Sequence, residues 1–193
     1  MVDVARPGPT TLLEFEGVDA LKYDQVSYRI GPADDAVGVG EVSEADLASM
    51  RGHSLRVEGT VTNGVVSKRF AWTFSQSTHY VDCSNLDYGE GVTVPSGARE
   101  TVQLTMHGDH LWYDGLSADD AQVRGAAIIA ADANDDGEVS QAELEAVLLT
   151  SLPLDQYDTT SAAGVKTLAD FLETLSRTVG HFRGEGDCTA TSR

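Results

Sequence analysis

Apolar and polar residues alternate most regularly between residues 54 and 74, in the sequence SLRVEGTVTNGVVSKRFAWTF. The dipeptide Asn63-Gly64 lies at the centre of this segment, and it strongly favours a two-residue hairpin turn between antiparallel strands. Such a turn would pair Thr62 with Val65 and give the hairpin one apolar face and one polar face. The pattern therefore predicts a β-hairpin that packs on one side only.

Shorter segments with strand-like composition lie on both sides of this hairpin. We expect strands at 11–17, 21–30, 78–83, 91–95 and 98–107. Ser43 opens a capping-box-like pattern, SEAD, which predicts a short helix over 44–50. These elements predict an antiparallel β unit, similar to a sandwich, over residues 1–115.

Helical spacing of apolar residues replaces the alternating pattern after residue 115. It predicts helices over 117–131, 141–152 and 161–179, with Gly180 as the residue that stops the third helix. No low-complexity linker separates the two halves of the chain. The predicted fold class is therefore α+β, in which the β unit of residues 1–115 packs on a helical unit of residues 116–193 as one integrated domain.

Composition and charge narrow the class of protein. Hydrophobic residues make up 41% of the 193 residues, and the formal net charge is −18. This charge argues against nucleic acids and anionic membranes as partners, and it suits cation binding. No apolar run is long enough to insert into a membrane.

Two cysteines, Cys83 and Cys188, predict a disulfide, although two buried free thiols in a cytosolic protein are the alternative. We accordingly expect a secreted, periplasmic or cell-surface protein. The chain opens MVDVARPGPTT, without the apolar segment of a signal peptide, so an exported protein would be the mature form behind an added Met1.

The segment 132–143, DANDDGEVSQAE, has oxygen-bearing residues at the spacing of a calcium-binding loop. The expected ligands are Asp132, Asn134, Asp136, Glu138 through its backbone carbonyl, Ser140 through a water, and Glu143, with Gly137 at the bend. This pattern resembles the EF-hand family over about residues 117–152, which implies a structural Ca²⁺ ion between two helices. A solvated acidic turn is the alternative. Residues 35–47 align with 132–144, as a decayed second loop or as a shared turn-then-helix pattern.

Histidines suggest a second metal site. His107 and His110 lie in the sequence MHGDHLWYD, and either His181 or His79 could join them once the disulfide forms. Imidazole is a good ligand for zinc and copper. Chance clustering is the alternative, and His181 beyond a helix end is favoured by the helix dipole alone.

Two further resemblances concern this second site. HGDH resembles the end of the zinc motif of metallo-β-lactamase-fold hydrolases, but Thr105 stands where that motif begins with histidine. The histidines beside Trp112 are similar in outline to small secreted bacterial copper-binding proteins, and the order of elements resembles secreted bacterial proteins of metal-binding type.

We therefore predict a secreted metal-binding protein with structural calcium and a histidine-based copper or zinc site. Two alternatives remain open. The first is a metal-dependent hydrolase or oxidase that uses the His107/His110 cluster, with Asp109 or Asp114 as the candidate base. The second is a calcium-stabilised adhesion or scaffold domain at the cell surface.

Overall fold

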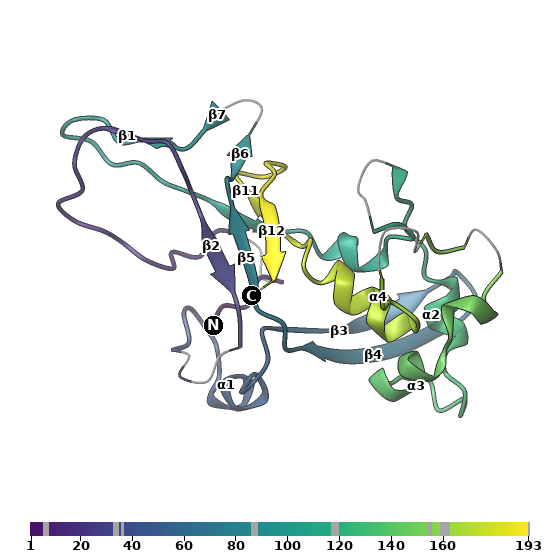
Figure 1. The fold of residues 1–193 in the computed structure, drawn as a ribbon. Helices are drawn as coiled ribbons and strands as arrows, with labels where there is room; N and C mark the ends of the chain where they lie inside the picture. The colour runs from purple at the N-terminus through teal and green to yellow at the C-terminus, as the bar shows by residue number, and fades with distance from the viewer. Residues whose placement is uncertain are drawn as a thin grey trace. The chain divides into compact units, whose positions relative to one another are not determined.

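The structure is a computed structural model, and its fold is mixed α+β, with more strands than helices (Figure 1). It describes residues 1–193 apart from 6–7, 33–34, 36, 86–88, 117–119, 154–155, 159–162 and 193. The chain forms two compact units. Unit 1 consists of 1–55, 75–106 and 180–193, and unit 2 consists of 56–74 and 107–179.

Unit 1 is built mainly from short strands. It contains β1 (Lys22–Tyr23), β2 (Tyr28–Ile30), α1 (Glu44–Ser49), β5 (Thr78–Val81), β6 (Ser84–Asn85), β7 (Gly89–Glu90), β8 (Val92–Thr93), β9 (Leu104–Met106), β11 (Gly180–Phe182) and β12 (Thr189–Ser192). Strand β5 is central, with β2 and β12 antiparallel to it on either side. The other strands form the antiparallel pairs β1–β8, β6–β7 and β9–β11.

The predicted disulfide is confirmed, and the core of unit 1 surrounds it. Cys83 and Cys188 are bonded, and Cys83 is packed in a cluster with Tyr80, Val92 and Phe182. Cys83 follows β5 and Cys188 precedes β12, so the bond closes the end of this strand pair. The bond joins residues 105 apart in the sequence and holds 180–193 in this unit.

Unit 2 joins the hairpin to the helices. It contains β3 (Leu55–Thr62, except for its first residue), β4 (Ser67–Phe74), the 3₁₀-helix η1 (Gly108–Trp112), α2 (Ala126–Ala130), β10 (Glu138–Val139), α3 (Gln141–Ala146), the 3₁₀-helix η3 (Leu149–Ser151) and α4 (Leu168–Leu175). Strand β10 pairs with β4 in parallel, in the order β10-β4-β3. The Trp72 indole N–H donates to the Val139 carbonyl at 2.9 Å, and both residues are buried.

The predicted hairpin is present, but its turn is centred one residue later than expected. The Asn63 N–H donates to the Val66 carbonyl at 3.2 Å, and the Thr62 hydroxyl lies 2.7 Å from that of Ser67. The Asn63 side chain also accepts from the N–H groups of Val65 and Val66, which stabilises the longer turn. Thr62 is therefore opposite Ser67 rather than Val65, and the same faces are kept because the shift is even.

Several predicted strands are shorter than expected or are not formed. Residues 11–17 are exposed and form no strand, and within 98–107 only β9 is a strand. Residues 21–30 contain the two short strands β1 and β2. Alternation in the sequence overestimated these strands because few of their apolar side chains find a partner: Leu13 is 74% exposed and Phe15 is 77% exposed.

The helices are also shorter than predicted. Of the expected helix 117–131, residues 117–119 lie outside the described part and Val123 forms an antiparallel bridge with Tyr113. Among the described residues of this range, α2 is the only α-helix. The third helix begins at Leu168 because Thr167 caps it, and it ends at Leu175. Gly180 does not stop it: this residue is the first of β11.

The two units divide the chain differently from the expected boundary at 115/116. The hairpin of β3 and β4 belongs with the helices because β4 pairs with β10, and residues 180–193 belong with the β-rich unit because β12 pairs with β5. The C-terminal part is thus a mixture of helices and strands. Among the described residues, no helix has both the length and the apolar character needed to cross a membrane.

Candidate metal centres

The pairing of β9 with β11 places two of the predicted histidines on one face. His181 is opposite Thr105 and Gly180 is opposite Met106. The pattern continues one residue further, where the His107 N–H donates to the Val179 carbonyl at 2.8 Å. His107 and His181 are therefore diagonal neighbours, and in an antiparallel pair such residues point to the same side within reach of long side chains.

The 3₁₀-helix η1 brings in the third histidine. His107 is the residue that precedes η1, and His110 lies three residues later within it. A 3₁₀-helix has three residues per turn, so side chains three apart lie above one another. The His107 and His110 ring centroids are 5.5 Å apart as a result.

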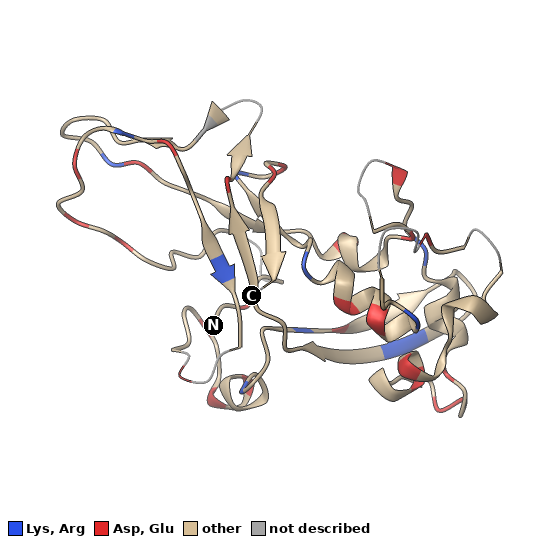
Figure 2. Cartoon of the chain, viewed as in Figure 1, with Lys and Arg blue, Asp and Glu red and all other residues tan. Residues whose placement is uncertain are grey.

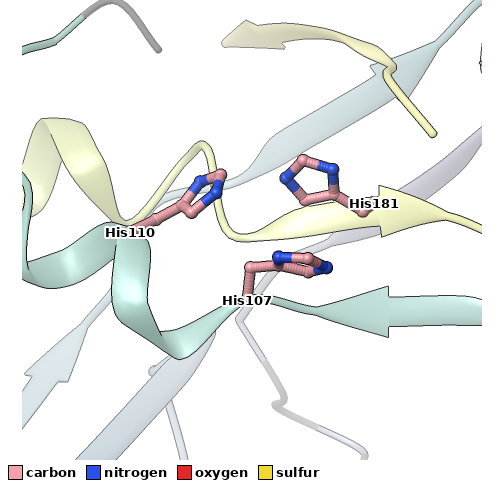
Figure 3. Close-up of side chains that lie close together, drawn as sticks. All are labelled: His107, His110 and His181. Carbon is pink, nitrogen blue, oxygen red and sulfur yellow. The ribbon is translucent and has the colours of Figure 1, made fainter. Parts of the chain in front are cut away.

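These three imidazoles form a group, which we call the histidine cluster: His107, His110 and His181. One ring nitrogen of each lies within 4.8 Å of the others, and the rings gather together (Figure 3). Among the described residues, no other three histidine, cysteine or carboxylate side chains converge in this way. His110 is the most enclosed of the three, at 8% exposed.

The surroundings of the cluster orient its rings. The His110 Nδ1 atom lies 3.1 Å from the Thr178 hydroxyl, and its ring packs against Tyr113 with centroids 4.7 Å apart. The Asp109 carboxylate lies 4.0 Å from His107 Nδ1 and accepts a hydrogen bond from the Tyr113 hydroxyl at 2.9 Å. Partial burial opposes ionisation of Asp109, but this hydrogen bond and the two neighbouring histidines lower its pKa overall.

The other two histidines are not part of the cluster. His79, the alternative ligand, lies in β5 between Arg29 and Thr191 of the neighbouring strands. His53 contacts the Ser75 hydroxyl at 2.9 Å through Nδ1. Of the four histidines considered for the site, the structure thus brings together three and leaves His79 apart.

The predicted calcium loop lies between α2 and α3, and its backbone bends at Gly137, where φ is +85°. This left-handed conformation favours glycine. The side chain of Asp132 turns inward, where its two oxygens accept from the N–H groups of Asp136 and Gly137 at 3.2 and 3.0 Å. At the other end, Glu143 accepts from Ala133 at 3.0 Å.

The remaining expected ligands also contact the loop itself. Asn134 Oδ1 accepts from the Asp136 N–H at 3.0 Å, and Asp136 Oδ1 accepts from the Glu138 N–H at 2.9 Å. Ser140 and Glu143 form a reciprocal capping box at the start of α3. This cap lowers the pKa of Glu143, chiefly through the hydrogen bond from the Ser140 backbone.

A lysine on β4 contacts this loop. Lys68 Nζ lies 2.6 Å from Asp132 Oδ2 and 2.9 Å from Asp135 Oδ1. The Asp132 side chain is fully shielded from solvent, and 13% of the Lys68 side chain is exposed. The hydrogen bond between Lys68 and Asp132 is the main cause of both pKa shifts: it lowers the pKa of Asp132 and raises the pKa of Lys68.

Sequence reasoning missed the two side chains that approach the sites from elsewhere in the chain. Lys68 occupies a polar position on a predicted hairpin, and nothing in its sequence context links it to residue 132. Thr178 stands near the end of a predicted helix, where a hydroxyl has many possible partners.

Acidic residues number 31 against 13 basic ones and are spread along the whole chain (Figure 2), so the protein favours cations generally.

Comparison with known proteins adds no relative. No family model matches this chain, and no curated protein and no solved structure is significantly similar to it.

Proposed function

We propose that this protein binds a divalent transition-metal ion, zinc or copper, through His107, His110 and His181. The observation that carries this proposal is the convergence of one nitrogen from each ring within 4.8 Å. Three neutral imidazoles suit Zn²⁺ and Cu²⁺, both of which accept nitrogen ligands. The Asp109 carboxylate beside His107 would offset part of the charge of the bound ion.

A binding role is favoured over turnover. A metal-dependent hydrolase or oxidase needs a base beside the ion, for which Asp109 and Asp114 were the candidates. Asp109 accepts from the Tyr113 hydroxyl, and Asp114 forms an ion pair with Arg124 and accepts from the Gln122 N–H at 2.7 Å. Both carboxylates are thus engaged in contacts that hold the local fold.

Titration of metal-stripped protein with Zn²⁺ and Cu²⁺ in a calorimeter tests the proposal. We expect one ion per chain, and a loss of affinity of at least about 100-fold in each of His107→Ala, His110→Ala and His181→Ala, because each change removes a direct ligand. His79→Ala and His53→Ala are matched controls and should bind as the unaltered protein does. No stoichiometric binding, or an equal loss in His79→Ala, would refute the assignment.

A second proposal is a structural Ca²⁺ ion at residues 132–143. All six ligand positions of the EF-hand pattern are filled, and the inward turn of Asp132 and Glu143 supports it. The carboxylates of such a loop repel one another until a cation neutralises them, so we expect calcium to stabilise unit 2.

The disulfide supports an oxidising location, namely secreted, periplasmic or cell-surface.

Thermal unfolding with and without calcium tests this second proposal. Calcium should raise the melting temperature of the unaltered protein, and Asp132→Ala or Glu143→Gln should abolish the rise. Glu145→Gln removes the same charge from α3 outside the loop and should retain it. Elemental analysis of protein purified without chelator would show which metals it carries. Calcium without zinc or copper would favour the adhesion or scaffold alternative.

A further inference from the structure

Thr178 connects the histidine cluster to the end of α4. Its Oγ1 atom lies 3.1 Å from His110 Nδ1. The same hydroxyl donates to the Leu175 carbonyl at 2.9 Å, and the Thr178 backbone N–H donates to that carbonyl at 2.9 Å as well. Leu175 is 1% exposed, so its carbonyl lies at a buried helix end where such donors are needed.

The two contacts of the Thr178 hydroxyl are compatible with only one neutral tautomer of His110. A threonine hydroxyl has one hydrogen and two acceptor positions. Both contacts of the hydroxyl form together only when its hydrogen points to the Leu175 carbonyl and its oxygen accepts from His110, and this arrangement makes Nδ1 the donor. A neutral imidazole has only one N–H group, so Nε2 then keeps its lone pair.

We propose that Thr178 is a positioning residue that holds His110 as the Nδ1–H tautomer and makes Nε2 its metal-binding nitrogen. This inference rests on the proposed metal site at the histidine cluster. A hydrogen-bond partner of a metal-binding histidine raises the affinity for the metal, because it orients the lone pair of the ligand nitrogen before the ion binds. The Tyr113 ring, tilted by 32° to the His110 ring, packs against it and restricts its rotation.

Nuclear magnetic resonance of ¹⁵N-labelled, metal-free protein at about pH 8, where an ordinary histidine is neutral, tests the tautomer directly. Two-bond ¹H–¹⁵N correlations should show His110 with a protonated Nδ1 and an unprotonated Nε2. Thr178→Ser keeps the hydroxyl and should keep this pattern. Thr178→Val has nearly the same shape without the hydroxyl, and it should give a mixture of tautomers.

Zn²⁺ titration of the same three proteins provides the second measurement. We expect Thr178→Val to bind about 10- to 100-fold more weakly and Thr178→Ser to bind within about threefold of the unaltered protein. A protonated Nε2 in the unaltered protein would overturn the inference even if the valine variant does not fold. Unchanged tautomer and affinity in Thr178→Val would overturn it as well.

The two proposals can fail separately. If the unaltered protein shows the Nδ1–H tautomer but takes up no Zn²⁺ or Cu²⁺, the metal site is refuted, and with it the metal-binding role of Thr178, while the hydrogen-bond assignment stands. If the ion binds with the same affinity with and without the Thr178 hydroxyl, the metal site stands and the positioning role is refuted.

Discussion

At the scale of single residues, Lys68 has the most direct bearing on a proposed site. Its ammonium group already neutralises Asp132, which would be the first calcium ligand of the loop. A calcium ion and an ammonium group repel each other, so both cannot share this carboxylate without a loss of binding energy. Lys68 should therefore support the loop in the absence of calcium and weaken calcium binding.

Replacement of Lys68 by Met tests this competition, because methionine fills a similar volume without the charge. We expect the variant to melt at a lower temperature without calcium and to bind calcium about tenfold more tightly, measured by calorimetry. Lys22→Met removes the exposed ion pair with Asp24 in unit 1 and should change neither quantity. Equal or weaker calcium binding in Lys68→Met would contradict the competition.

Glycine is required at position 180 because there is no space for a side chain. A Cβ atom there would lie 2.6 Å from a ring carbon of Tyr80 and 2.7 Å from the Tyr28 hydroxyl. These two rings are stacked with centroids 4.7 Å apart, so they cannot easily separate.

Substitution of Gly180 by Ala should lower the free energy of unfolding by about 1 to 3 kcal/mol, as overpacking usually does. Urea denaturation followed by circular dichroism measures this change. Gly108→Ala is the matched control, because a Cβ there meets nothing within 4 Å, and it should stay within about 0.5 kcal/mol of the unaltered protein. A fully stable Gly180→Ala would show that the two tyrosines can move apart.

At the scale of elements, α4 owes its first turn to a reciprocal cap. The Thr167 side chain accepts from the Asp170 N–H, and Asp170 accepts from the N–H groups of Lys166 and Thr167, both at 2.9 Å. These two backbone hydrogen bonds lower the pKa of Asp170. A carboxyl whose pKa is lowered in the folded state stabilises the protein above its unfolded pKa of about 3.9 and loses this effect as the pH falls through the folded value.

Asp170→Asn should therefore destabilise the protein by about 1 kcal/mol at pH 7 and by less below about pH 3. Urea unfolding at a series of pH values would show the difference between the two proteins shrink on acidification. Asp187→Asn, at an exposed position outside any helix, is the matched control for the loss of one carboxylate. A difference that is constant from pH 7 to pH 2 would exclude the carboxylate as its cause.

Elements that depend on neighbouring residues were predictable from the sequence, and those that depend on distant ones were not. The cap at Ser43 and the hairpin near Asn63 act within a few positions, so their sequence patterns are informative. The parallel pairing of β10 with β4 was missed, because no local pattern records which strand a two-residue segment will join. Helix lengths were overestimated because apolar spacing continues beyond the residues that the structure folds as helix.

At the scale of the whole molecule, the same distinction applies to the candidate sites. The six positions of the calcium loop are fixed by spacing within twelve residues and could be named from the sequence. The histidine cluster requires the distant pairing of β9 with β11, and the sequence left His181 and His79 as equal choices. Only the register that sets His181 opposite Thr105 distinguishes them.

The disulfide should make a large contribution to the stability of unit 1, because it closes a loop of 105 residues. The double change Cys83→Ser and Cys188→Ser should lower the free energy of unfolding by about 3 to 5 kcal/mol, mainly through the greater entropy of the unfolded chain. Unaltered protein in strong reductant should resemble the double variant. Equal stability of the reduced and oxidised proteins would contradict this estimate.

The division of the chain into interleaved segments also constrains its synthesis. The polypeptide passes between the two units at 55/56, 74/75, 106/107 and 179/180. Every segment of unit 2 leaves the ribosome before β11, β12 and Cys188 do, so all of unit 2 is available to fold before unit 1 is complete. Unit 1 cannot be completed until β12 emerges, and before then the edge of β5 that β12 will occupy is unpaired. A chaperone would be of most use during this time.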